Sequence, residues 1–209
     1  LAFIPVFCFL LLPVRMLLIG EPGGYLRAAG TIQWGLMTTV FSLSHAAFLL
    51  ILRLAEAPGE RVGPGLVLTL VLLTELNDIA QYLWGKALGR RKVAPTISPN
   101  KTWGGFLGGV ATTTLLGTLL GPWLTPMGTL ASLGAGLIIG LGGFVGDLNI
   151  SALKRDLQIK DTGTALPGHG GILDRVDSLT YTAPLFMHYV YVLFAWTSYG
   201  GLVRWPFGP

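Results

Sequence analysis

Residues 151–177 bring together side chains that suit phosphate chemistry. The stretch reads SALKRDLQIKDTGTALPGHGGILDRVD, in which bases and acids alternate around a glycine-rich turn. Basic side chains bind phosphate oxygens, carboxylates bind a divalent metal or orient a base, and glycines let the backbone turn tightly around His169. A salt-bridged surface loop would explain the charges, but not the Pro-Gly-His-Gly-Gly turn followed by Asp-Arg-Val-Asp. The candidates are Lys154, Arg155, Lys160 and Arg175 for phosphate, and Asp161, Asp174 and Asp177 for metal binding or orientation.

Carboxylates also stand near the ends of two apolar segments. Glu75 and Asp78 close one segment, and Asp147 follows a glycine-rich approach in another. Ionisable groups inside apolar spans usually face a cavity, which favours a functional role for Asp78, whereas Glu75 could equally be interfacial or pair helices. We expect the helix with Asp147 to end near residue 149, where the macrodipole disfavours a carboxylate unless a cation compensates. Mg²⁺ suits this site, because one Cys and three His offer no zinc-binding set.

A second polar stretch, residues 86–104, holds Ser98, Pro99, Lys101 and Thr102. One cation and two hydroxyl groups suit phosphate oxygens, and the proline stiffens the turn. A plain basic loop explains the same residues, so the stretch by itself leaves both interpretations open.

The composition predicts that these residues are mounted on membrane-spanning helices. The 209 residues are 52% hydrophobic and 11% charged, whereas soluble domains average about 25% charged. Apolar runs of roughly 20 residues, enough to cross about 30 Å of hydrocarbon, separate the charged stretches. The net charge of +4 does not indicate nucleic-acid binding, because the aromatic residues are not interleaved with basic ones. We predict an all-α, polytopic membrane protein, a single domain over residues 1–209, with six spans at 1–19, 31–52, 64–85, 105–123, 129–149 and 178–199.

The basic residues predict which side of the membrane the polar stretches face. With the amino terminus outside, eleven of the fourteen Lys and Arg residues lie on the cytoplasmic side, and only Arg53, Arg61 and Arg204 lie outside. Such a bias sets the orientation of membrane proteins. Both polar stretches are therefore expected in the cytoplasm. The first apolar run begins at Leu1 without a basic leader, so we expect the chain to lack an N-terminal part of the full-length protein.

Together these stretches resemble the signature of the phosphatidate cytidylyltransferases, also called CDP-diacylglycerol synthases. The signature has Ser, Lys-Arg, Lys-Asp, His-Gly-Gly and Asp-Arg-x-Asp at set spacings, all of which this chain meets. An Asn-Asp helix end at Asn77 and a Ser-Pro-x-Lys-Thr loop extend the resemblance over residues 77–177. Two residues depart from the pattern, since Gly104 stands where the family usually has Glu and Gln81 where it more often has a small residue. The matching signature residues are Ser151, Lys154, Arg155, Lys160, Asp161, His169, Gly170, Gly171, Asp174, Arg175 and Asp177.

The resemblance implies a bacterial inner-membrane enzyme of phospholipid biosynthesis that converts CTP and phosphatidate to CDP-diacylglycerol and pyrophosphate in a cavity open to the cytoplasm. Mg²⁺ would be held by Asp147 and Asp174, and the resemblance leaves a second, monovalent cation and a homodimer open. The implied catalytic residues are Asp78, Lys154, Arg155, Lys160, Asp161, His169, Arg175 and Asp177. The implied substrate-binding residues are Asn77, Ser98, Pro99, Lys101, Thr102, Ser151, Gly170 and Gly171.

Three alternatives remain at the level of sequence. A CTP-dependent transferase that acts on another lipid phosphate, such as a polyprenyl phosphate, keeps the nucleotide chemistry. A transporter would also use glycine-rich helices and intramembrane carboxylates, but it should show paired interruptions in two related halves. Gly104 raises the third, a binding or regulatory relative that lost activity together with the Glu.

Overall fold

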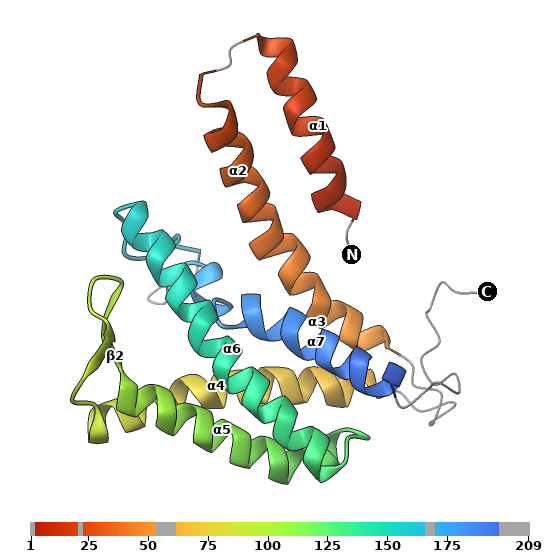
Figure 1. The fold of residues 1–209 in the computed structure, drawn as a ribbon, viewed down its shortest axis with the longest axis vertical. Coiled ribbons are helices and arrows are strands. Elements are labelled where there is room, and N and C mark those ends of the chain that lie inside the picture. The colour runs from red at the N-terminus through yellow and green to blue at the C-terminus, as the bar shows by residue number, and fades with distance from the viewer. Residues whose placement is uncertain (1–2, 21–22, 53–61, 166–169, 197–209) are drawn as a thin grey trace.

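The protein is a set of long apolar helices with one short hairpin (Figure 1). A computed structural model describes residues 3–20, 23–52, 62–165 and 170–196. Its helices are α1 (Phe3–Ile19), α2 (Tyr25–Leu36), a π-helical turn η1 (Met37–Phe41), α3 (Ser42–Ile51), α4 (Gly63–Leu88), α5 (Trp103–Leu124), α6 (Thr129–Asp156), a 3-10 turn η2 (Leu173–Arg175) and α7 (Leu179–Trp196). The strands β1 (Lys92–Ala94) and β2 (Ser98–Thr102) pair antiparallel.

The expectation of an all-α membrane protein is confirmed, but the number of spans is not six. Within the described residues, four helical segments are long and apolar enough to cross a bilayer, namely Tyr25–Ile51, Gly63–Leu88, Trp103–Leu124 and Thr129–Asp156. The first expected span is a helix of 17 residues, which falls short of that length. The last is α7, whose 18 residues include three tyrosines and a histidine that lower its hydropathy.

Helices α4, α5 and α6 pack side by side through small residues and one buried amide. A Cβ placed on Gly117 of α5 would lie 2.8 Å from the Cα of Gly136 in α6, so glycine permits this close approach. Asn77 of α4 has no exposed surface. Its Nδ2 donates to the Gly140 carbonyl at 3.3 Å, and its Oδ1 accepts from the Thr113 hydroxyl at 3.0 Å. The amide thus ties three helices together and fixes the rotation of α4.

Helices α4 and α6 end later than the sequence indicated, at Leu88 and Asp156, and the longer α6 changes the position of Asp147. Helix α6 does not end near residue 149 but continues to Asp156, so Asp147 is an interior residue and the macrodipole argument for a cation there was wrong. The 19 residues from Thr129 to Asp147 nevertheless span about 27 Å, close to the hydrocarbon thickness. If α6 crosses the bilayer from its first residue, we expect Asp147 near the membrane boundary.

The polar stretch between α4 and α5 is a folded hairpin. It begins after α4 ends at Leu88 and returns along β2 directly into α5. Thr102 is the N-cap of α5, and its hydroxyl accepts a hydrogen bond from the Gly105 N–H at 3.1 Å. Such a cap satisfies one of the free amides at a helix start and fixes where the helix begins. The hairpin is thereby held beside the end of α4 and the start of α5, apart from the α1–α2 arm, which extends to the top of Figure 1.

Candidate active site

A cavity of about 490 Å³ lies beneath the hairpin, between the last turns of α4, the start of α5 and the later half of α6. One wall carries basic and hydroxyl side chains from the hairpin, and another carries carboxylates from α4 and α6. The lining residues are Asp78, Gln81, Tyr82, Gly85, Lys86, Gly89, Lys92, Ser98, Asn100, Lys101, Thr102, Gly105, Phe106, Phe144 and Asp147.

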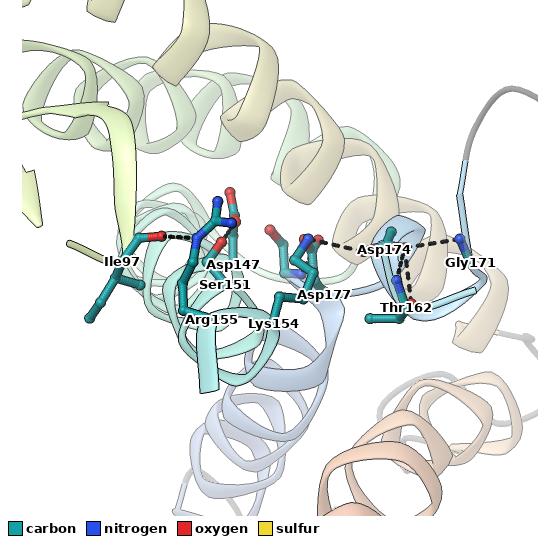
Figure 2. Close-up of polar contacts among 10 residues, drawn as sticks. Ile97, Asp147, Ser151, Lys154, Arg155, Thr162, Gly171, Asp174 and Asp177 are labelled. Carbon is teal, nitrogen blue, oxygen red and sulfur yellow. Dashed lines mark hydrogen bonds and ion pairs between the residues drawn. The ribbon is translucent and has the colours of Figure 1, made fainter. Parts of the chain in front are cut away.

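Lys101 and Asp147 join the two walls. The Lys101 Nζ lies 2.6 Å from Asp147 Oδ2 and 4.7 Å from the ring centroid of Phe144, one turn earlier on α6. Asp147 Oδ1 accepts a hydrogen bond from the Ser151 hydroxyl at 3.2 Å (Figure 2). The Asp147 side chain keeps 28% of its surface exposed, so its carboxylate remains open to the cavity.

Two more carboxylates approach from α4 and from the entry to α7. Asp78 Oδ2 accepts from the Ser178 hydroxyl at 2.8 Å, and Asp177 Oδ1 accepts from the Ser178 N–H at 2.8 Å. Burial, followed by the negative charge of Asp147, raises the pKa of Asp177 to about 6, although the Ser178 N–H and nearby lysines act in the opposite direction. Asp78 also interacts electrostatically with Asp147 and Asp177. Three carboxylates therefore share one region of negative potential.

Asp174 organises the loop that precedes α7. Its Oδ2 accepts hydrogen bonds from the Thr162 N–H and hydroxyl and from the Gly171 N–H, at 2.8, 2.9 and 2.9 Å, and its Oδ1 pairs with Lys154 Nζ at 2.9 Å (Figure 2). Burial opposes ionisation, but the Lys154 ammonium and these hydrogen bonds outweigh it and hold the pKa of Asp174 well below its usual range. Only 5% of the side chain is exposed.

Asp147 and Asp174, which were expected to share a metal, have different surroundings in this structure. Asp147 faces the cavity, whereas the oxygens of Asp174 are occupied by Lys154 and the loop amides, and Figure 2 shows the two side chains apart. Among the described residues, no three His, Cys, Asp or Glu side chains are arranged as a preformed metal-binding group. Hard carboxylates fit Mg²⁺ by their chemistry. The residues that would hold it from the cavity side are Asp147 and Asp78.

The hairpin residues expected to bind substrate take up two positions. Ser98, Lys101 and Thr102 line the cavity, whereas Pro99 is exposed on β2 outside the lining. Asn77 is buried between helices and also stands outside the lining. Arg155 is exposed on the last turn of α6, and its Nε donates to the Ile97 carbonyl at 3.1 Å, which pins the hairpin to α6 (Figure 2).

The signature residues after α6 form the loop around Asp174 instead of the cavity wall. Gly170 adopts a positive φ of 82°, and a Cβ on Gly171 would crowd the Thr162 hydroxyl and the Gly163 nitrogen. Both glycines are thus required by the loop's own backbone. Lys160, Asp161 and Arg175 are exposed and do not line the cavity. His169 lies outside the described residues.

Sequence reasoning missed part of the cavity wall. Gln81, Tyr82, Gly85 and Lys86 continue the face of α4 that begins at Asp78, one and two turns later. The i, i+3, i+4, i+7 spacing from Asp78 could have revealed them, since only Lys86 lies beyond the expected span of 64–85. The remaining lining residues that were not singled out are Gly89, Lys92, Asn100, Gly105, Phe106 and Phe144.

Known proteins resemble the chain over nearly its whole length. The model of the cytidylyltransferase family matches residues 1–193. A protein of Escherichia coli K12 named uncharacterized protein YnbB is 53% identical over 190 residues, which cover 91% of this chain and 63% of that protein. Phosphatidate cytidylyltransferases of Synechocystis and Pseudomonas aeruginosa are 42% and 46% identical over 138 and 125 residues. Those two matches cover 64% and 58% of this chain, and 46% of each relative.

The chain thus spans between about half and three fifths of the length of these relatives. The family match extends over the cavity, the hairpin and the Asp174 loop alike. The chain belongs to the cytidylyltransferase family.

Proposed function

We propose that the protein transfers the cytidylyl group of CTP to the phosphate of a membrane lipid, with phosphatidate as the first acceptor to test. One observation carries the proposal. The cavity places lysines and hydroxyls of the hairpin opposite carboxylates of α4 and α6, at the end of a bundle of apolar helices. A charged nucleotide and an apolar lipid could meet there. The relatives named phosphatidate cytidylyltransferase support this acceptor and this donor.

The reaction forms one bond and breaks one. A phosphate oxygen of the lipid attacks the α-phosphorus of CTP in line, and the bond to the β-phosphate breaks, so pyrophosphate leaves. Because a phosphate monoester is already anionic near neutral pH, no strong general base is required. Positioning and charge stabilisation should supply most of the rate.

The basic and the acidic residues of the cavity have different roles in this proposal. Lys101 lines the cavity, and its ammonium lies 2.6 Å from Asp147 Oδ2 and 4.7 Å from the Phe144 ring centroid, so a phosphate in the cavity can reach it. Ser98, Thr102 and Lys92 lie beside it in the lining and add donors for the triphosphate. Mg²⁺, when bound by Asp147 and Asp78, supplies positive charge against the transferring group. The Lys154–Asp174 pair holds the adjoining loop in place.

The basic bias of the polar stretches supports placing this cavity on the cytoplasmic side of a bacterial inner membrane, where CTP is available. This placement is part of the proposal.

The test is direct assay of the purified protein in lipid nanodiscs. CTP and Mg²⁺ are supplied with phosphatidate, lysophosphatidate or a polyprenyl phosphate, and pyrophosphate and the CDP-lipid are both measured. We expect CDP-diacylglycerol from phosphatidate, and Lys101→Met should reduce kcat/KM by about a hundredfold, as for loss of a charged transition-state contact. An exposed basic residue outside the cavity lining, Arg90→Met, shows whether loss of charge alone matters. Absence of pyrophosphate release with every acceptor contradicts the proposal, and product from polyprenyl phosphate alone changes the acceptor.

A further inference from the structure

An apolar groove runs along α5 and α6 and adjoins the cavity at Phe106. Its volume is about 500 Å³, and Phe106 lines both the groove and the cavity. Three residues of α5 at four-residue spacing and three of α6 at the same spacing form its sides. They are Leu107, Ala111, Leu115, Leu133, Leu137 and Leu141.

We propose that this groove holds an acyl chain of the acceptor lipid while the lipid phosphate lies at Lys101. The inference rests on the proposed function and names the place where the lipid enters the site. The expected occupant of the groove is a single hydrocarbon chain that is attached to a phosphate.

At the junction between groove and cavity, a charged, an aromatic and an apolar region follow one another, which is the order that suits a lipid phosphate. The Lys101 Nζ lies 4.7 Å from the Phe144 ring centroid, and the Phe144 and Phe106 centroids are 4.4 Å apart. Beyond Phe106 the lining is almost entirely apolar. A ligand that starts at the ammonium therefore passes two aromatic rings and then meets hydrocarbon, which is the sequence of phosphate, backbone and acyl chain in a phospholipid.

Threonines are the only polar residues in the groove lining. The Thr118 hydroxyl donates to the Thr114 carbonyl within α5 at 2.7 Å, so this polar side chain is satisfied by its own helix. The Thr114 hydroxyl is buried and has no hydrogen-bond partner among the described residues. Leu107 and Leu115, which line the groove, each expose 60% of their surface. A nucleotide or a hydrated ion would lose its hydrogen bonds in such a place, whereas a hydrocarbon chain loses none.

The dimensions also favour one acyl chain. Residues Phe106 to Thr118 of α5 extend for about 18 Å, and one leaflet of the hydrocarbon core is about 15 Å thick. The groove lining thus extends over about the length of one lipid chain in a leaflet.

Photo-crosslinking tests the site independently of catalysis. Phosphatidate with a diazirine near the end of one acyl chain is incorporated at low density into nanodiscs that contain the protein. We expect cross-links on residues 107–118 of α5 and 133–141 of α6, and unlabelled phosphatidate should compete. Diacylglycerol with the same diazirine chain is the control for bulk lipid, because it lacks the phosphate. Equal labelling of the groove by both probes, or labelling elsewhere, overturns the proposal.

A matched pair of variants tests the consequence for the reaction. Ala111→Trp fills the middle of the groove, whereas Leu119→Trp places the same ring on an exposed part of α5 outside it. We expect Ala111→Trp to raise the KM for long-chain phosphatidate about tenfold while the KM values for dihexanoyl phosphatidate and CTP stay unchanged. Leu119→Trp should leave all three unchanged. Equal KM changes in the two variants would contradict an acyl-chain site. So would an Ala111→Trp protein whose oligomeric mass changes while its KM values do not.

The two proposals fail in different ways. Phosphate-dependent cross-links in the groove without any CDP-lipid product would refute cytidylyl transfer and keep the lipid site. Product formation with cross-links elsewhere would refute the groove and keep the transfer.

Discussion

At the scale of single residues, the carboxylates divide into those that face the cavity and one that holds a loop. Asp147 and Asp174 are both acidic residues beside a lysine, yet Asp147 keeps 28% of its side chain exposed and Asp174 keeps 5%. Exposure leaves Asp147 free to exchange Lys101 for another cation. Asp174 would have to give up Lys154 and three hydrogen bonds first.

Replacement of Asp174 should therefore loosen the loop. Asp174→Asn keeps one carbonyl oxygen but loses the charge that pairs with Lys154, at a cost of about 2 kcal/mol in local stability. We expect faster hydrogen exchange at the Thr162 and Gly171 amides, measured by mass spectrometry without Mg²⁺. Asp161→Asn, an exposed acid in the same loop, is the control and should exchange as the wild type does. Unchanged protection together with lost Mg²⁺ binding would instead identify Asp174 as a metal ligand.

Asp177 gives the metal-free protein a pH dependence of known sign. Its pKa is about 6 in the fold, above the ordinary 3.8, so the fold favours the protonated form. The stability that this group contributes is complete below about pH 4 and is lost as pH rises through 6. Asp177→Asn mimics the protonated carboxyl. With EDTA present, we expect its Tm to match the wild type at low pH and to exceed it at pH 7.5, whereas parallel curves would contradict the shift.

At the scale of helices, the contact between α4 and α5 explains why Gly104 can differ from its family. A Cβ on Gly104 would lie 2.8 Å from the Leu88 carbonyl oxygen and 3.3 Å from the Gly89 nitrogen, both of which are backbone atoms. Neither can move without displacing the end of α4. This close contact gives a structural reason for glycine at position 104, and the activity of the chain is a separate question.

Restoring the family's residue should consequently harm the protein. We expect Gly104→Glu, and equally Gly104→Ala, to lower the Tm and to leave turnover no higher than in the wild type, because the added Cβ separates α4 from α5. Gly128→Ala is the control, since nothing lies within 4 Å of a Cβ at that position. Thermal unfolding and CDP-lipid formation are measured on the same preparations. Higher turnover in Gly104→Glu would support a relative that lost activity with its Glu.

Hydropathy predicted the long helices α4, α5 and α6, because each is an extended apolar run, but it expected six spans where four of the described helical segments qualify. It placed the start of α6 at residue 129, where the structure has it. The end was predicted too early, since Lys154 and Arg155 look like loop residues although they belong to the last turn of the helix. The resemblance pointed to the hairpin lysine, Lys101, but could not reveal that Phe144 and Asp147 flank it. That arrangement depends on how α6 rotates against α5, which close glycine contacts decide.

At the scale of the whole molecule, the polar residues gather at one end of the α4–α5–α6 unit. The hairpin and the last turns of α4 and α6 lie at that end, and the short connection between α5 and α6 lies at the other (Figure 1). If these three helices cross the bilayer, the two ends must lie on opposite sides. From the excess of basic residues at the hairpin end, we then expect that end to face the cytoplasm.

Single cysteines at the two ends test this orientation. Cys8→Ser removes the chain's one cysteine, and Thr96→Cys in the hairpin turn or Gly128→Cys before α6 then adds one. Both positions are exposed, so neither change disturbs packing. In intact spheroplasts, a membrane-impermeant maleimide should label Cys at position 128 and should reach position 96 only after permeabilisation. The reverse pattern would place the cavity outside the cell, away from CTP, and labelling of both positions in intact cells would mean that α5 does not span the bilayer.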